Sequence, residues 1–201
     1  MVVWVIMPTG NFAQNRFGIM AGAGISRESI NLVYTSGKIG YEVIASYNIL
    51  WKDDLNFRIN SGYKQRGHKY EIFYLSSGLT ESDFTVYHLL TIGPDLIIPL
   101  NKINKRIYFY GGLTTDYLVD YKIAFEDSPE DAGVHLADSY SKIQFSADAR
   151  IGMRFNSSLF VEFRGNGNFI NKIKDKKRPG PRAFDYYFGL TLGYHFKNCA
   201  D

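Results

Sequence analysis

Apolar and polar side chains alternate along most of this chain with a period of two residues. The clearest example is the segment 184–196, in which every second side chain is large and apolar. Its apolar positions are Phe184, Tyr186, Phe188, Leu190, Leu192, Tyr194 and Phe196. Successive side chains of a β-strand point to opposite faces, so this pattern predicts a strand with one apolar and one polar face.

The same alternation recurs in seven other segments, and we therefore predict eight strands. The other segments are 17–25, 41–51, 55–64, 84–100, 107–120, 142–155 and 159–169. The segment 84–100 is the least regular, because Gly93-Pro94 interrupts it and His88 falls among its apolar positions. Proline has no amide hydrogen to donate to a neighbouring strand, so we expect a β-bulge at Gly93-Pro94.

The connections between the predicted strands alternate in length. Short turns are expected at 52–54, 101–105 and 156–158, and longer loops at about 27–38, 66–83, 124–138 and 172–182. Short turns at one end and long loops at the other are typical of an outer-membrane barrel. We therefore predict an all-β fold, a single antiparallel eight-stranded up-and-down transmembrane β-barrel formed by residues 15–201, with both termini in the periplasm.

Many charged residues fall on the polar face of the predicted strands, which would line the lumen. The interior of an eight-stranded barrel is just wide enough to be filled by side chains, and charges enclosed there must be paired. The seven acids assigned to this face are Glu42, Asp95, Asp116, Asp120, Asp148, Glu162 and Asp185. The seven bases are Arg58, Lys64, Lys122, Lys142, Arg150, Arg154 and Arg164. Equal numbers of both signs predict a plugged lumen with an ion-pair network, in which His195 would also take part.

The inverted arrangement is a soluble, lipocalin-like barrel with an apolar interior that binds a hydrophobic ligand. The bulk of the aromatic face disfavours it, because the rings of the last two strands alone would crowd a small interior. In the membrane arrangement, aromatic rings near the strand ends form interfacial girdles. The candidates are Trp51, Tyr63, Tyr117, Tyr121, Phe155, Phe184 and Phe196.

The amino-acid composition excludes several classes of function. The single cysteine excludes an internal disulfide framework and a cysteine-based zinc site, and the net charge of +3 gives no argument for nucleic acid. Residues 1–14 begin with a short apolar run and end in Phe12-Ala13-Gln14, which is typical of the end of a secretory signal. We expect this segment to be the remnant of a signal peptide, with the mature chain beginning near Asn15.

Two groups of residues are candidates for chemistry. His88 lies on the apolar face near Ser76, Ser77, Glu81 and Ser82, and this makes a lipid-modifying enzyme one candidate function. However, no G-x-S-x-G element is present and no catalytic triad can be placed. The chain is therefore predicted to be non-enzymatic, and no cofactor or metal is implied. The basic stretch 172–182 is expected either to contact lipopolysaccharide phosphates or to be a solvated loop. Its basic residues are Lys172, Lys174, Lys176, Lys177, Arg178 and Arg182.

The region from about Arg16 to Phe196 resembles the eight-stranded outer-membrane β-barrel proteins of Bacteroidota, of the PorT-like or porin family. The resemblance rests on four elements in order: the glycine-rich segment 17–25, Tyr63-Lys64-Gln65-Arg66-Gly67, the segment 108–113 with Gly111-Gly112, and the closing segment 187–196. Two departures concern the subfamily: Tyr87 is not followed closely by Ile-Pro-Leu, and five residues follow Phe196. The resemblance implies an outer-membrane location in a Gram-negative bacterium and a part in secretion or envelope assembly.

The leading hypothesis is a non-enzymatic barrel with a closed lumen that serves as a structural or interaction component. Its expected partners are outer-membrane lipid, lipopolysaccharide and proteins of an envelope complex. The alternatives are a narrow gated channel for small ions, a lipid-modifying enzyme centred on His88, and the soluble ligand-binding barrel.

Overall fold

A computed structural model describes residues 16–30, 35–52, 55–74, 79–100, 106–125, 134–135, 141–169 and 183–196. The predicted signal remnant, residues 1–14, lies outside the described residues. The strands are β1 (Arg16–Ile30), β2 (Thr35–Lys52), β3 (Leu55–Tyr74), β4 (Leu79–Pro99), β5 (Ile107–Phe125), β6 (Val134–His135), β7 (Ile143–Arg154), β8 (Leu159–Asn168) and β9 (Ala183–His195). Among the described residues, no helix is long and apolar enough to cross a membrane.

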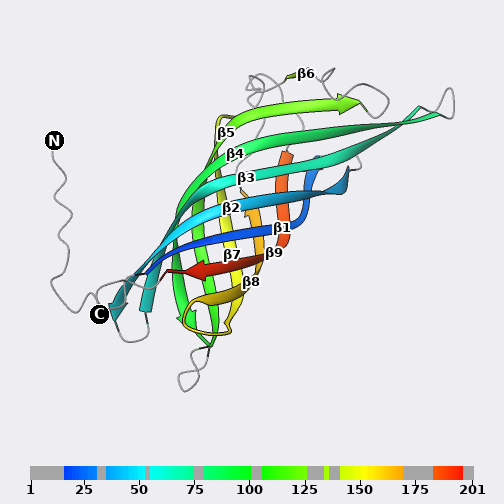
Figure 1. The fold of residues 1–201 in the computed structure, drawn as a ribbon. Helices are drawn as coiled ribbons and strands as arrows, with labels where there is room; N and C mark the ends of the chain where they lie inside the picture. The colour runs from blue at the N-terminus through cyan, green and yellow to red at the C-terminus, as the bar shows by residue number, and fades with distance from the viewer. Residues whose placement is uncertain are drawn as a thin grey trace, which may run out of the picture.

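Eight of the strands form a closed, all-antiparallel barrel (Figure 1). Each strand pairs with its neighbours along the chain, β5 pairs directly with β7, and β1 pairs with β9 to close the ring. The two-residue strand β6 only adds a short pairing to the end of β5. The predicted fold, a single antiparallel eight-stranded barrel, is confirmed.

The strands differ in length, and β3 and β4 are the longest, with 20 and 21 residues. Their pairing continues without a register shift from Asn56 opposite Ile97 to Tyr74 opposite Leu79. The two strands therefore project past the rest of the barrel as a hairpin (Figure 1). Most of the segment expected to be a loop at 66–83 is thus strand, because the ladder of backbone hydrogen bonds continues through its polar residues.

The register shift in the β4–β5 pairing comes from a bulge in β5 and not from Gly93-Pro94. The β4–β5 register shifts between His88, which faces Asp120, and Leu89, which faces Leu118. Val119 is therefore the additional residue. The register is the same on both sides of Gly93-Pro94, so the proline omits one hydrogen bond without inserting a residue.

The bulge changes which side chains of β5 point inward. Leu118 is buried before the bulge and Tyr121 is buried after it, so the inward positions change from even to odd numbers. Tyr121 stacks on Tyr87 of β4 with ring centroids 5.8 Å apart. Asp120 and Lys122, both expected in the lumen, consequently leave the buried stripe and are half-exposed.

The two faces of the barrel wall differ in polarity. Most large apolar side chains point outward and are exposed, for example Ile39 at 74% and Leu190 at 58%. The interior is polar in its middle, and small apolar clusters lie toward its ends, such as Tyr87, Leu89, Leu118 and Tyr121. This is the reverse of a soluble lipocalin-like barrel, and an apolar outer wall is the surface that a membrane barrel presents to lipid.

Aromatic rings inside the barrel pack onto glycines of neighbouring strands. The ring of Tyr108 occupies the space that a Cβ on Gly152 would fill, and the ring of Phe160 does the same at Gly193. A side chain at either glycine would displace the ring. These positions require glycine because of close packing, and they help to fill the lumen toward the end where β5 and β8 begin.

Candidate functional site

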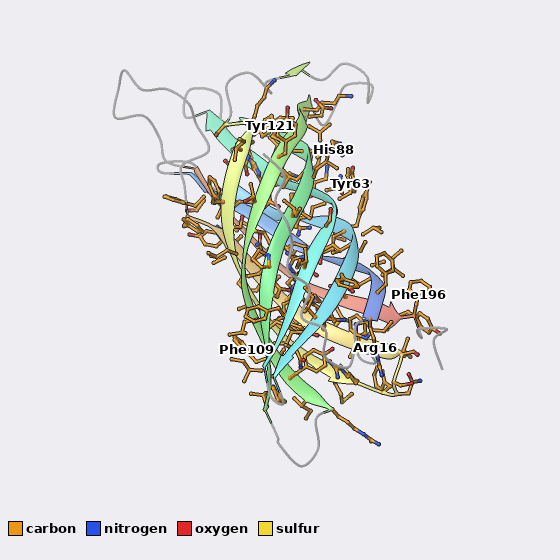
Figure 2. All side chains as sticks on the ribbon, turned by 90° about the vertical axis from the view of Figure 1, so that its left-hand side faces the viewer. Arg16, Tyr63, His88, Phe109, Tyr121 and Phe196 are labelled. Carbon is orange, nitrogen blue, oxygen red and sulfur yellow. The ribbon has the colours of Figure 1, made fainter. Side chains whose placement is uncertain are left out.

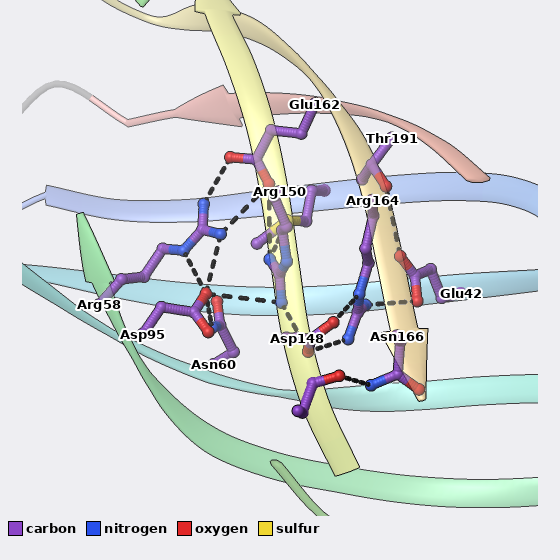
Figure 3. A network of polar contacts seen from close by, with 12 residues as sticks. Glu42, Arg58, Asn60, Asp95, Asp148, Arg150, Glu162, Arg164, Asn166 and Thr191 are labelled. Atoms are coloured by element: carbon purple, nitrogen blue, oxygen red, sulfur yellow. Dashed lines mark hydrogen bonds and ion pairs between the residues drawn. The ribbon is translucent and has the colours of Figure 1, made fainter. Parts of the chain in front are cut away.

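The lumen is crossed by a network of ion pairs (Figure 3). In its first part, Arg58 of β3 donates from Nη1 to Glu162 Oε1 of β8 over 2.6 Å and from Nη2 to Asp95 Oδ2 of β4 over 3.0 Å. Asn60 donates to the same Asp95 oxygen over 2.6 Å. The guanidinium of Arg58 also lies 3.8 Å from the centre of the Tyr110 ring. Every donor group of this arginine therefore faces an anion or a ring.

The second part of the network is centred on Arg164 of β8. This arginine donates to Asp148 of β7 over 2.5 Å and to Glu42 of β2 over 2.6 Å. Arg150 joins the two parts, because it lies 3.2 Å from Asp148 and 3.4 Å from Glu162. Thr191 of β9 donates to the other oxygen of Glu42 over 3.2 Å.

A third part lies further along β3. Lys64 donates to Asp116 of β5 over 2.9 Å, and Ser146 donates to the other carboxylate oxygen over 3.1 Å. Arg66 donates to Glu42 over 2.9 Å and lies 3.4 Å from the centre of the Tyr187 ring. Alternate residues of one strand thus reach into the lumen at successive levels, as the period of two requires.

The charged side chains of the network are buried inside the barrel. The charged side chains of its ion pairs are at most 3% exposed. Charges removed from water are tolerated when they are paired, and each charged residue of the network lies against at least one residue of opposite charge. The arrangement joins opposite walls of the barrel through paired charges at its centre.

Most of the residues predicted to line the lumen are buried there. They are Glu42, Arg58, Lys64, Asp95, Asp116, Asp148, Arg150, Glu162, Arg164 and Asp185. Arg154 is half-exposed near the end of β7, with its guanidinium 5.0 Å from the Tyr108 ring centre. Lys142 is a correction: it lies immediately before the first residue of β7 and is exposed, and the buried positions of this strand begin at Gln144. Asp120 is a second correction, because the bulge at Val119 turns it out of the lumen.

Among the described residues, three ionisable side chains buried in the lumen were missed by the sequence prediction. Arg66 and His68 continue the inward stripe of Lys64, and Glu28 lies at the far end of β1. The Nδ1 atom of His68 is 3.2 Å from Glu28 Oε2 and is hydrogen-bonded to Thr85 over 2.9 Å. The sequence signal for Arg66 and His68 was that they continue the alternation of Lys64. The polar residues around them led instead to the prediction of a loop.

His195 lies at the other end of the interior. It was expected in the ion-pair network, but its Nε2 is hydrogen-bonded to the Asn48 amide over 2.9 Å. Its ring stacks on Phe160 with centroids 4.4 Å apart. The residue packs against an amide and a ring because it lies beside the aromatic cluster at this end and not among the carboxylates.

His88 lies on the outer wall, as its place among the apolar positions predicted (Figure 2). Its Nδ1 is hydrogen-bonded to the Tyr63 hydroxyl. The residues weighed as its catalytic partners, Ser76, Ser77, Glu81 and Ser82, have no described side chains. Across the described ranges, no group of three or more His, Cys, Asp and Glu residues is placed to hold a metal ion.

The predicted girdle residues divide between the two faces. Tyr63 is half-exposed on the outer wall, and Tyr117, Phe155 and Phe196 are between 45% and 51% exposed. Phe184 is half-exposed, whereas Tyr121 is buried because of the bulge. The side chain of Trp51 is not described. The basic residues Lys172, Lys174, Lys176, Lys177, Arg178 and Arg182 also lie outside the described residues.

The fold is similar to solved outer-membrane barrels. Ail, the attachment invasion locus protein of Yersinia pestis, crystallised with the heparin analogue sucrose octasulfate, has 17% identity and a TM-score of 0.53, over 90% of this chain and 99% of that chain. Neisserial surface protein A has 14% identity and a TM-score of 0.51, over 90% of this chain and 97% of that chain. No protein-family model and no curated protein matches the chain. The chain therefore has the fold of the eight-stranded outer-membrane barrels of Gram-negative bacteria.

Proposed function

We propose that this protein is a closed, non-conducting barrel of a Gram-negative outer membrane and acts as a structural or interaction component. The observation that carries the proposal is the buried ion-pair network. Arg58 of β3 and Glu162 of β8 join opposite walls of the barrel, and Arg150 and Arg164 fill the space beside them. With a lumen of this kind, the barrel would interact with partners through the outer ends of its strands and through its outer wall.

The projecting β3–β4 hairpin supports an interaction role. It extends the barrel beyond the level at which the other strands end (Figure 1). The Ail structure was solved with a sulfated heparin analogue, so barrels of this fold can hold a polyanion. We extend this to the present chain as a proposal, in which the basic residues of 172–182 and the hairpin contact anionic surface groups.

A part in secretion or envelope assembly remains a proposal that rests on the resemblance to PorT-like barrels of Bacteroidota. In the element Tyr63-Lys64-Gln65-Arg66-Gly67, which is part of that resemblance, Lys64 pairs with Asp116 and Arg66 pairs with Glu42 inside the lumen. Deletion of the gene followed by a survey of secreted and outer-membrane proteins tests this role, and an unchanged protein profile would contradict it.

The closed lumen is tested by single-channel recording in planar lipid bilayers. The wild-type barrel should give no current steps, and Arg58→Ala should lower the temperature at which the barrel unfolds in SDS without producing current. Lys142→Ala, an exposed lysine outside the network, is the matched control and should change neither property. Current steps in the wild type that grow in Arg58→Ala or Arg150→Ala would establish a gated ion channel instead.

The absence of enzymatic activity is proposed as well. His88 is hydrogen-bonded to the Tyr63 hydroxyl on the outer wall, which gives it a structural role there. His88→Gln should therefore leave the lipid A composition of the outer membrane unchanged by mass spectrometry. Loss of an acyl or sugar modification in that variant would establish a lipid-modifying enzyme.

A further inference from the structure

Three polar side chains form one row across neighbouring strands on the outer wall of the barrel. Tyr41 of β2 is paired with Gln65 of β3, and Gln65 is paired with His88 of β4. Side chains that are directly opposite each other in an antiparallel sheet have Cβ atoms about 5 Å apart. All three are at least partly exposed and alternate with buried lumen residues, so they point outward. We refer to Tyr41, Gln65 and His88 as the polar row.

Tyr63, an outward residue of β3 next to the polar row, holds the imidazole of His88 in place. Its hydroxyl is hydrogen-bonded to Nδ1 of His88, and the two ring centres are 5.8 Å apart (Figure 2). The Tyr63 ring also lies 6.1 Å from the Tyr41 ring, centre to centre. A neutral imidazole carries one hydrogen, so when the Tyr63 hydroxyl donates to Nδ1 the ring hydrogen is on Nε2. The row then presents an N–H donor at His88.

The polar row lies at the edge of the apolar band of the wall. On β4, His88 is ten residues from Ile98, an exposed apolar side chain at the opposite end of the barrel. Ten residues of a strand rise about 33 Å, and at the usual tilt they span roughly 25 Å, the height of the apolar band of a membrane barrel. The outward side chains between these two residues are all apolar: Leu90, Ile92, Pro94 and Leu96. The row is therefore at the level where acyl chains join their headgroups.

The polar row is a local feature of the wall. In the ring of strands, β7 and β8 lie opposite β2 and β3. The outward side chains at the corresponding ends of β7 and β8 are Ile143 and Phe169, which are 52% and 54% exposed. Both are apolar. The hydrogen-bonding groups of the row are thus gathered on three adjacent strands.

We propose that the polar row binds the uncharged carbonyl and hydroxyl groups at which acyl chains join the headgroup of an outer-leaflet lipid. The Gln65 amide and the Tyr41 hydroxyl can each donate and accept a hydrogen bond, and the His88 ring donates from Nε2. Within the described part of the chain, the side-chain amide of Gln65 has no hydrogen-bond partner. An unpaired polar group is costly beside the hydrocarbon region, and ester or amide carbonyls of a lipid at this depth supply the partner.

The proposed site is uncharged, with His88 neutral, so it recognises the junction of the lipid and not its phosphate. Sugar-based lipids and glycerophospholipids both carry carbonyl groups at that junction. The inference rests on the proposed function, because it requires the outer wall to face the lipid of an outer membrane.

The test is a titration of the purified, folded barrel in detergent micelles with dephosphorylated lipid A, followed by native mass spectrometry. Gln65→Leu should weaken binding about 5-fold, and Gln65→Leu with His88→Phe about 25-fold, the losses expected for one and two neutral hydrogen bonds. The same titration with phosphatidylethanolamine identifies the source of the junction. Equal losses with both lipids indicate a site for either class, and losses with lipid A alone indicate a sugar-based lipid.

Ser61→Ala is the matched control, because it removes an exposed hydroxyl from the same face of β3 within the apolar band and should bind like the wild type. The heat-dependent gel shift shows whether each variant is folded, and if the double variant does not fold, Gln65→Leu decides the question. In barrel with ¹⁵N-labelled histidine, the His88 signals should show hydrogen on Nε2 in the wild type and a mixture of both tautomers in Tyr63→Phe.

Unchanged binding in Gln65→Leu, or an equal loss in Ser61→Ala, would overturn the lipid site. A dimer that the double variant converts to a monomer without a change in lipid binding would show that the row is a contact between two copies of the chain, and would also overturn it. None of these measurements depends on conductance, so a failure here is distinct from a failure of the closed-lumen proposal.

Discussion

Arg58 and Glu162 meet across the full width of the barrel, with Arg58 Nη1 2.6 Å from Glu162 Oε1. Their strands, β3 and β8, are four positions apart in the ring of eight in either direction. The pair can therefore form only when the ring has closed with the correct stagger. Buried ion pairs add little net stability over apolar packing, but they penalise an arrangement that leaves one partner alone. The pair is thus suited to select the closed register.

Removal of one partner of this pair should be costly. We expect Arg58→Ala to lower the free energy of unfolding by about 3–5 kcal/mol, because it leaves Glu162 and Asp95 buried without their shared cation. Urea unfolding in lipid vesicles, followed by intrinsic fluorescence, measures the change. Replacing Arg58 by Met and Glu162 by Leu together should cost less than the two single replacements summed. Additive costs would show that the two side chains do not interact.

The packing of Tyr108 against Gly152 predicts a second sensitive position. Gly152→Ala should destabilise the barrel by about 1–3 kcal/mol, because the added methyl group forces the Tyr108 ring from its place beside Glu162 and Tyr110. The same unfolding experiment measures this cost. Tyr108→Ala in the Gly152→Ala background should add less than it does in the wild type, since the clash is then relieved. A full additional cost would contradict the proposed packing.

The bulge at Val119 predicts which side chains at the end of β5 point outward and which point inward. In a Cys199→Ser background, Asp120→Cys should react with a membrane-impermeant maleimide, whereas Tyr121→Cys should resist it, because Tyr121 is 1% exposed. Deletion of Val119 should reverse this order, since one residue fewer moves every later side chain to the other face. If both cysteines react alike before the deletion, the bulge lies elsewhere.

The outer part of the β3–β4 hairpin should be dispensable for folding. Beyond Tyr70 of β3 and Asp83 of β4, the two strands pair only with each other within the described residues. Replacement of residues 72–81 by an Asn-Gly turn should therefore preserve the heat-dependent gel shift and the unfolding midpoint. If the hairpin is the interaction surface, the shortened barrel should also lose binding to a sulfated polysaccharide column. A failure to fold would show that the hairpin contributes to barrel formation.

The period of two in the sequence determined the fold class and the face on which most side chains lie. In β9, Tyr186 and Leu190 point outward and Asp185 and Thr191 inward, as their alternation predicted. This information is local, because the direction of a side chain follows from the geometry of its own strand. The same reasoning failed at Asp120, because a single bulged residue reverses the face to which each following side chain points. No pattern in the sequence indicated that bulge.

Only the tertiary structure decided which residues meet. The sequence placed Arg58, Glu162, Arg164 and Glu42 in the lumen, but nothing local indicates that Arg58 meets Glu162 or that Arg164 meets Glu42. Those partners depend on the register of every strand pair around the ring, because the stagger of a closed barrel is the sum of all its registers. The position of the Lys38 ammonium nitrogen, 4.9 Å from the centre of the Phe84 ring, depends in the same way on the registers of β2, β3 and β4.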